Sequence, residues 1–327
     1  MALPKAFPLE APILPESRQI GRTPAIDALE RQIVEMGHHT LLFAPRHVGK
    51  TSMAWAVLDR IRDADWGSAL EVNVSHGPVR SSAALAARVA DQARAAKIRV
   101  DPVTQTVRRV FKKVARVIGT PAIGAAAKHL GLDEGVDATT VAAAVDQALA
   151  ATDNDAEMNL REVLGAIQAA AIAADKPAVI FLDEVQRLCT DWSDGNDSLY
   201  SQEPIAEVME HPEGRVVFLL AGSEVSAIEQ LLADGQPLHR DGMTFEVQAI
   251  RTEDWRHGLS NRFAEVNLEI EGARINQILE ASEGHPQRTM RVCAHVHQLA
   301  DNGTFEISEV LVDEAISKAK THPSWTA

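Results

Sequence analysis

The chain has 327 residues, 46% of them hydrophobic and 24% charged, which is the composition of an ordinary folded protein rather than of a disordered or fibrous one. Its formal net charge of −14 disfavours general attraction to nucleic acid or anionic lipid, because the long-range field has the wrong sign. The apolar runs are strand-sized and too short for a membrane span, and two well-separated cysteines without a secretory leader favour a reducing cytoplasm.

The N-terminal half begins with an arm and continues as an alternation of strands and helices. Residues 1–19 contain four prolines and predict an extended N-terminal arm. An amphipathic helix follows, with Pro24 in its first turn and Gly37 after its end. Strand-like runs then alternate with helical patterns, which predicts an α/β fold with a parallel sheet covered by helices. The predicted strands lie at 40–44, 69–74, 178–182, 216–221 and 245–250, and the first helices at 49–61 and 81–96.

Helical sequence interrupts and then ends this pattern. Between the second and third strands an alanine-rich stretch is longer than one crossover needs, and it predicts a helical insert over about 101–175 with helices at 141–151 and 160–173. Beyond residue 250 the sequence predicts further helices at 253–264, 273–281, 287–300 and 307–320. We therefore expect a core over 20–250 and a C-terminal helical domain over 251–327.

The run from Ala44 to Ser52 matches the phosphate-binding pattern G-x-x-x-x-G-K-[ST], with alanine in place of the first glycine. A strand runs into this loop and a helix leaves it, so backbone N–H groups and the helix N-terminus converge on a polyphosphate. Lys50 would bridge the β- and γ-phosphates, and the Thr51 hydroxyl would ligate Mg²⁺. The alternative is a strand–turn–helix that contains Gly-Lys-Thr by chance. The predicted phosphate-binding residues are Ala44, Pro45, Arg46, His47, Val48, Gly49, Lys50, Thr51 and Ser52.

Two polar strand ends supply the remaining chemistry. The apolar run that begins at residue 178 ends in Asp183 and Glu184. Beside a phosphate loop, the first acid would hold Mg²⁺ through water and the second would polarise the water that attacks the γ-phosphate. Ser223, at the end of the next apolar run, would contact the γ-phosphate or orient the water, unless it only caps the helix that follows. The sequence thus predicts an enzyme that binds and hydrolyses ATP with Mg²⁺.

Taken together, the chain resembles the AAA+-like and STAND ATPases, most closely the archaeal-type ATPase family that is also found in bacteria. The resemblance covers about residues 18–300. It rests on the phosphate loop and the acid pair, and on weaker short motifs. These motifs are Ile20-Gly21-Arg22, Asp183-Glu184-Val185-Gln186, Ala221-Gly222-Ser223, Pro237-Leu238-His239-Arg240 and Glu283-Gly284-His285-Pro286.

The resemblance implies a three-layer core with a five-stranded parallel sheet, in which the acid-pair strand lies next to the loop strand, and a helical lid that closes over the nucleotide. It places Ile20, Gly21 and Arg22 near the adenine. His285 and Pro286 would approach the base or ribose, and Arg288 would reach the phosphates. Arg240 would sense nucleotide in the same subunit or act on a neighbour.

Two departures from the family pattern bear on this expectation. Ala44 places a methyl group where a glycine is usual, so nucleotide affinity would be weakened if that position needs the backbone freedom of glycine. Many members also carry repeat domains after the ATPase, whereas this sequence ends at Ala327.

A basic amphipathic helix is predicted over 107–118, within a stretch that has six basic and no acidic residues from 102 to 132. It would bind nucleic acid, an acidic partner or a membrane surface, or simply pair with acids of the same chain, which we favour. The first reading of the whole chain is an ATP-driven conformational switch or motor that can assemble into a homo-oligomer or act on a protein effector. The rival readings are a DNA-associated ATPase akin to replication initiators or transposition regulators, and a nucleotide-gated module with negligible turnover.

Overall fold

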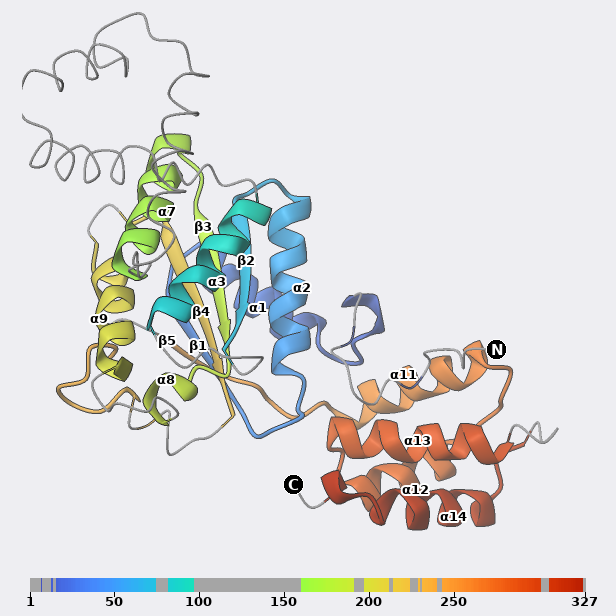
Figure 1. Cartoon of the computed structure of the whole chain (residues 1–327). Helices are drawn as coiled ribbons and strands as arrows, with labels where there is room; N and C mark the ends of the chain where they lie inside the picture. Colours follow the sequence, from blue (N-terminus) through green and yellow to red (C-terminus); the bar gives the residue numbers. More distant parts are fainter. Residues whose placement is uncertain are drawn as a thin grey trace, which may run out of the picture.

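The computed structural model describes residues 7, 13, 16–74, 82–96, 160–190, 197–211, 214–223, 229, 231–239, 243–300 and 306–325. Within this part the predicted fold class is confirmed, because a parallel sheet lies between two layers of helices (Figure 1). The helices predicted at 107–118 and 141–151, and Arg240, lie outside the described residues.

The sheet has five strands in the order β2-β3-β4-β1-β5, and every neighbouring pair is parallel. Parallel strands buried on both faces read as continuous apolar runs, and this is why β3 and β4 are buried along their whole length. The strands are β1 (Thr40–Phe43), β2 (Ser68–Asn73), β3 (Ala178–Asp183), β4 (Val216–Gly222) and β5 (Met243–Glu246).

Two sequence-based expectations about the sheet are wrong. The acid-pair strand β3 is not next to the loop strand β1, because β4 pairs with both and lies between them. The last strand is Met243–Glu246 rather than 245–250. It is an edge strand that pairs only along the four residues of β1, and its mostly exposed side chains carry little of the apolar signal that marks the buried strands.

Helices cover both faces of the sheet. On one face α1 (Thr23–Val34) and α2 (Lys50–Asp63) bury their apolar sides against alternate strand residues such as Phe181 and Leu219. On the other face α3 (Ser82–Ala95), α7 (Leu160–Ala174) and α9 (Asp197–Met209) cover Ile180 and Phe218. The short helix α8 (Arg187–Thr190) follows β3. The strand alternation therefore divides the core into two apolar layers that meet at the sheet.

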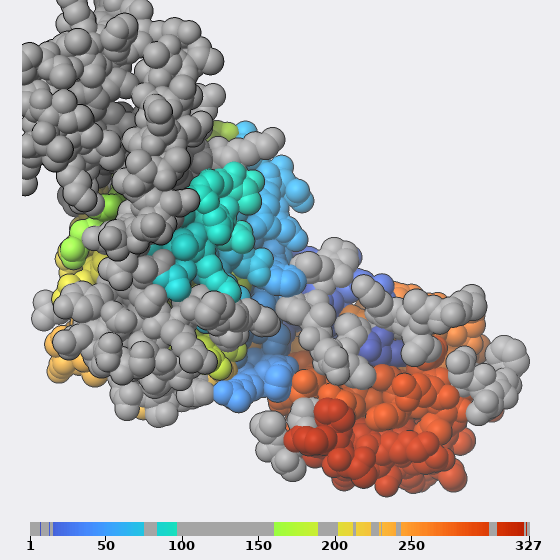
Figure 2. All heavy atoms as spheres, in the orientation of Figure 1, coloured from blue at the N-terminus to red at the C-terminus, as the bar shows by residue number. Residues whose placement is uncertain are grey.

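The C-terminal helices form a separate apolar cluster beside the core (Figure 1). We call these four helices the lid helices; they agree with the predicted segments to within two residues at each end. They are α11 (Thr252–Glu265), α12 (Gly272–Ser282), α13 (Pro286–Ala300) and α14 (Glu309–Lys320), and the short helix η2 (Pro323–Trp325) follows them. In Figure 2 their orange and red surface adjoins the blue segments that carry the phosphate loop.

The N-terminal arm contacts both units where the structure describes it. Phe7 is buried among the lid helices, with its ring centroid 4.8 Å from that of Phe263. The backbone N–H of Ile13 donates to Ser52 Oγ at 2.9 Å. The short helix η1 (Glu16–Arg18) places Glu16 against Arg60, which also binds Asp27 and Glu30 of α1. The arm thus joins the lid helices to α1 and α2.

Candidate active site

The phosphate loop is shaped by two residues in the left-handed backbone region. Gly49 has a φ of 101° and immediately precedes the first residue of α2, and no atom lies within 4 Å of the position a Cβ would take. His47 has a φ of 63°, a conformation that costs free energy for a residue other than glycine. This backbone turns the loop so that the first N–H groups of α2, which have no partner within the helix, face its mouth.

Ala44 does not need the freedom of glycine. Its φ is negative, and its methyl group is buried in the apolar layer formed by α1, α2 and the sheet. The alanine therefore fits the loop as folded, and the expected backbone penalty at this position is absent.

Lys50 is the buried cation of the loop. Its ammonium donates to the carbonyls of Ala44 and Pro45 at 2.8 and 2.9 Å. Burial lowers the pKa of Lys50, while the nearby charges of Glu184 and Asp183 raise it. The lysine therefore lies in the field of both acids at the end of β3.

Thr51 and Asp183 meet at the ends of α2 and β3. The Thr51 hydroxyl donates to Asp183 Oδ2 at 2.9 Å. Burial raises the pKa of Asp183, and the hydrogen bond from Thr51 opposes that shift. Asn73, whose side chain was not singled out from the sequence, reaches the same oxygen at 3.4 Å from the end of β2. In the sequence, Asn73 could have been recognised as a polar residue near the end of a predicted strand.

This oxygen set suits Mg²⁺. A hydroxyl and a carboxylate are hard ligands, and Mg²⁺ is usually held by one or two such groups together with phosphates and water. No cluster of three His, Cys, Asp or Glu side chains that could hold a metal by itself occurs in the described ranges.

Glu184 follows β3 in a left-handed turn with a φ of 61°. Its Oε2 accepts from Ser223 Oγ at 3.1 Å, and it also accepts a short hydrogen bond from Gln186 Nε2. Ser223 follows β4, the strand paired with β3, so the parallel sheet brings both residues to the same edge. Sequence reasoning placed Ser223 here, but it treated Gln186 only as part of a motif.

The lid helices reach the loop through the turn before α13. His285 Nε2 lies 3.2 Å from the Arg46 carbonyl, and Pro286 is the first residue of α13. Burial lowers the pKa of His285, and burial with the charges of Arg46 and Lys50 lowers that of His47. The turn was predicted to approach the base or ribose of a nucleotide, and the structure shows it in contact with the loop backbone.

Two lid arginines differ in where they point. Arg288 pairs with Glu283 at 2.9 Å and lies 5.7 Å from the centre of the Trp325 ring. Arg291, one turn further along α13, is 6% exposed, and its charge acts on His47. No hydrogen bond or ion pair of Arg291 is found within the described part of the chain. Sequence reasoning missed it, because helical register alone did not distinguish the two.

The segment from Ile20 to Arg22 lies between the loop and α11. Arg22, 6% exposed, donates to the carbonyls of Val48 and Gln248 at 2.8 and 2.6 Å, and burial lowers its pKa to about 10. Gly21 has a φ of 64°, and a Cβ there would lie 2.8 Å from the Cβ of Asp254. This glycine is required by both its backbone and its close approach to α11.

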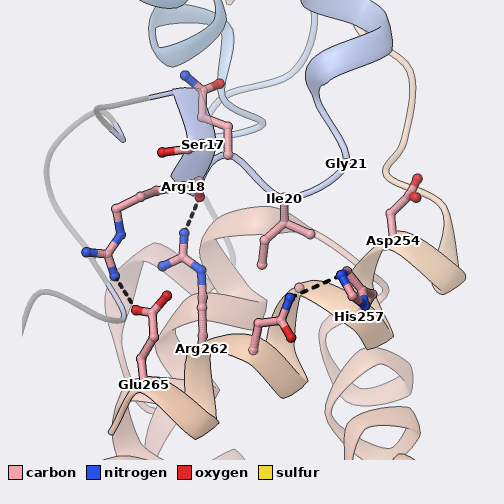
Figure 3. Close-up of a pocket in the computed structure, with 11 residues that line it drawn as sticks. Ser17, Arg18, Ile20, Gly21, Asp254, His257, Arg262 and Glu265 are labelled. Carbon is pink, nitrogen blue, oxygen red and sulfur yellow. Dashed lines mark hydrogen bonds and ion pairs between the residues drawn. The ribbon is translucent and has the colours of Figure 1, made fainter.

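A hollow of about 320 Å³ opens between residues 17–21 and α11 (Figure 3). Ile20 packs over Gly258, where an added Cβ would meet its side chain at 2.6 Å. Arg262 donates to the Arg18 carbonyl, and Arg18 pairs with Glu265 at 2.9 Å. The hollow thus has an apolar wall at Ile20 and a rim of paired charges.

Ser52 contacts the N-terminal arm through its hydroxyl and its carbonyl. Its hydroxyl accepts from Ile13, and its carbonyl accepts from the buried Gln19 side chain at 2.7 Å. Among the predicted phosphate-binding residues, the Ser52 side chain is hydrogen-bonded to the N-terminal arm.

The family model described as "ATPase family associated with various cellular activities (AAA)" matches residues 40–238, from β1 to beyond β4. The chain belongs to this AAA family. It is therefore an ATP-hydrolysing, nucleotide-binding enzyme, and the predicted AAA+ resemblance is confirmed. No curated protein sequence matches it. Among the helices that the structure describes, none is long and apolar enough to cross a membrane.

Solved structures with the same fold share little sequence with this AAA ATPase. A Walker-type ATPase of Pyrococcus abyssi has a TM-score of 0.61 at 16% identity. The match covers 95% of this chain and 75% of the Pyrococcus chain. The ORC2 protein of Aeropyrum pernix in its ADP form has a TM-score of 0.59 at 14% identity. The match covers 96% of this chain and 72% of the ORC2 chain. The ORC1 protein of the same organism, in complex with DNA, has a TM-score of 0.55 at 13% identity. The match covers 93% of this chain and 68% of the ORC1 chain. These likenesses support the fold.

Proposed function

We propose that this AAA ATPase is a nucleotide-driven conformational switch that binds ATP and Mg²⁺ at residues 44–52 and hydrolyses ATP with Glu184. The hydrogen bond between Thr51 and Asp183 carries the proposal, because it joins the two predicted metal ligands from segments 132 residues apart. A chance Gly-Lys-Thr turn would have no reason to meet an acid that ends a buried strand.

Lys50, Thr51 and the first N–H groups of α2 each have a defined task in this proposal. The N–H groups at the start of α2 and the Lys50 ammonium bind the β- and γ-phosphates. Thr51 and Asp183 hold Mg²⁺, the former directly and the latter through water. Mg²⁺, when bound, neutralises charge that develops on the transferred phosphoryl group.

Glu184 acts as the general base. Its carboxylate takes a proton from the attacking water, whose oxygen bonds to the γ-phosphorus while the bond to the β–γ bridging oxygen breaks, giving ADP and phosphate. Ser223, 3.1 Å from Glu184 Oε2, is placed to touch both the base and the γ-phosphate. Arg291 adds positive charge from the lid helices on the other side of the loop.

The nucleoside is assigned to the junction of core and lid helices. The hollow beside Ile20 and Gly21 lies at the lower end of the range of typical ligand pockets, about 300–1,000 Å³, and Ile20 offers an apolar contact to a base. Arg22 braces this segment against the Val48 carbonyl.

That arrangement explains how nucleotide would move the lid helices. His285 and Arg291 approach the loop from α13 and the turn before it, and Ile20 approaches α11. A nucleotide that contacts both the loop and the lid helices binds the closed arrangement more tightly than the open one. The difference between these two affinities sets how far the equilibrium shifts toward the closed state. Hydrolysis and phosphate release would remove part of that difference and reset the switch.

The test is ATP binding and hydrolysis by the purified chain beside Lys50→Ala and Glu184→Gln. We expect Lys50→Ala to lose binding and Glu184→Gln to bind ATP with only a residual turnover. Equal and poor ATP binding by all three proteins would overturn the loop assignment. Turnover unaffected by Glu184→Gln would overturn the role of the base and favour the nucleotide-gated module.

A second candidate function is a DNA-associated ATPase. The observation in its favour is the shared fold with the ORC1 protein whose structure contains DNA, and the acidic net charge opposes it. Salt-dependent DNA binding that is lost when Arg108, Arg109, Lys112 and Lys113 become alanine would support it. No binding at low salt would remove it. A homo-oligomer, a protein effector and a cytoplasmic location remain proposals.

A further inference from the structure

Gln186 forms a buried bridge between the turn that follows β3 and the end of β4. Its side chain is 2% exposed. Nε2 donates to Glu184 Oε2 and to Ser223 Oγ, the latter at 3.3 Å, and Oε1 accepts from the Ser223 backbone N–H at 3.3 Å. One amide therefore contacts the proposed base and both the hydroxyl and the backbone of its neighbour.

The surrounding backbone fixes where this amide can lie. The N–H of Val185 donates to the Ala221 carbonyl at 2.8 Å, which attaches the turn to β4 two residues before Ser223. The N–H of Arg187 donates to the Glu184 carbonyl at 3.0 Å, which closes the turn around Gln186. The amide is thus held at a set position, and it can in turn hold Glu184.

Within the described residues, the hydrogen bonds found to the Glu184 carboxylate come from Gln186 and Ser223. Its backbone adopts a left-handed conformation at φ 61°, which is unfavourable for glutamate and which persists only when neighbouring contacts impose it. Oε2 receives hydrogen bonds from Gln186 and Ser223, whereas Lys50 and Asp183 act on Glu184 through their charges. Without Gln186, one of these two donors is lost and the other, Ser223, loses two of its own contacts.

We propose that Gln186 is a positioning residue for ATP hydrolysis: it fixes the orientation of the Glu184 carboxylate and links that orientation to the position of Ser223. The inference rests on the proposed role of Glu184 as the base. In this proposal Gln186 acts on turnover through Glu184 and not by direct contact with the nucleotide or the attacking water. Because misplacement of a base by about 1 Å can cost on the order of 100-fold in rate, the expected effect is on kcat and not on ATP affinity.

The experiment measures kcat, the affinity for a non-hydrolysable ATP analogue with Mg²⁺, and the melting midpoint for Gln186→Met and Gln186→Ala. Methionine keeps the buried volume and removes the hydrogen bonds. The matched control is Gln168→Ala, because Gln168 is another buried amide that bridges to β4, but at its opposite end, where it accepts from the N–H groups of Arg215 and Val216. The same Gln186→Met change is also made in a Glu184→Gln background.

We expect Gln186→Met to lower kcat about 10- to 100-fold with analogue affinity within about twofold of wild type. Gln168→Ala should lower the melting midpoint but leave kcat within about twofold. In the Glu184→Gln background, Gln186→Met should cause no further loss, because the group that it aims is already gone.

Two results would overturn the inference while leaving the base in place. One is an unchanged kcat in Gln186→Met. The other is an equal loss of kcat from Gln186→Met in the wild-type and Glu184→Gln backgrounds, which would show that Gln186 acts on the fold and not on Glu184. If Glu184→Gln itself keeps full turnover, the proposed function fails, and the inference fails with it. The two failures are therefore distinguished by the Glu184→Gln protein alone.

Discussion

The Thr51 hydroxyl donates to Oδ2 of Asp183 at 2.9 Å, and the same oxygen lies 3.4 Å from the Asn73 amide. Asp183 is 5% exposed, and burial raises its pKa, so its carboxylate depends on these donors and on a cation. Three chain segments thus converge on one carboxylate at the carboxyl edge of the sheet.

We predict that Thr51→Ala and Asp183→Asn weaken ATP binding only when Mg²⁺ is present. Removal of a group that holds the metal directly or through water typically costs about 10- to 100-fold in metal affinity. Titration with an ATP analogue in Mg²⁺ and in EDTA measures this difference. Equal losses in both conditions would mean that these residues hold the loop and not the metal.

Arg291, rather than Arg288, is predicted to contribute to the nucleotide site. Arg291→Ala should weaken ATP binding or turnover about 10-fold, because a charged hydrogen bond to phosphate contributes roughly 1.5–3 kcal/mol. Arg288→Ala, which breaks the pair with Glu283, should have less than about twofold effect. Arg291→Lys keeps the charge and controls for folding. The prediction is wrong if Arg288→Ala is the more damaging change.

Arg60 is predicted to hold the arm to α1 and α2. It binds Glu16 through two nitrogen–oxygen pairs at 2.7 Å, and these contacts raise its pKa. Since single exposed pairs contribute at most about 1 kcal/mol, Arg60→Ala in this partly exposed network should lower the free energy of unfolding by about 1–2 kcal/mol. Arg94→Ala, which breaks one exposed pair with Asp91, should cost less than about 0.5 kcal/mol in the same urea titrations.

Phe7 is predicted to stabilise the lid helices. It is 9% exposed and packs on Phe263, so Phe7→Ala should cost about 3 kcal/mol through lost burial and the cavity left behind. Val310→Ala is the control, because Val310 is a 76% exposed apolar residue on α14. Hydrogen exchange of α11 and α13 measures the effect locally. Equal protection in Phe7→Ala and wild type would show that the arm does not support these helices.

His285 is predicted to make stability fall in mild acid. Its pKa in the folded chain is lowered by burial, so the unfolded chain binds the proton more readily in the window between the lowered value and the ordinary 6.5. The free energy of unfolding therefore decreases as pH falls through that window. His285→Gln should show a smaller decrease between about pH 7.5 and 5.5 than wild type. A His285→Gln profile parallel to wild type would contradict the prediction.

Local signals explain what the sequence predicted well. Continuous apolar runs and helical periodicity depend on near neighbours, so β3, β4 and the lid helices could be placed within a residue or two. The edge strand β5 was misplaced, because an exposed strand of four residues carries no such run. The insertion of β4 between β1 and β3 was also missed, because periodicity says nothing about strand order.

The sequence by itself determined the chemistry of this protein, because the phosphate loop and the acid pair are short segments whose residue types and spacing are set by what binds phosphate and metal. Only the tertiary structure decided which partners those residues meet. Asn73 and Gln186 contact Asp183 and Glu184 because neighbouring strands end at one edge, and α13 brings the charge of Arg291 to bear on His47. Such contacts join residues far apart in the chain, and their geometry follows from the packed layers and not from any local pattern.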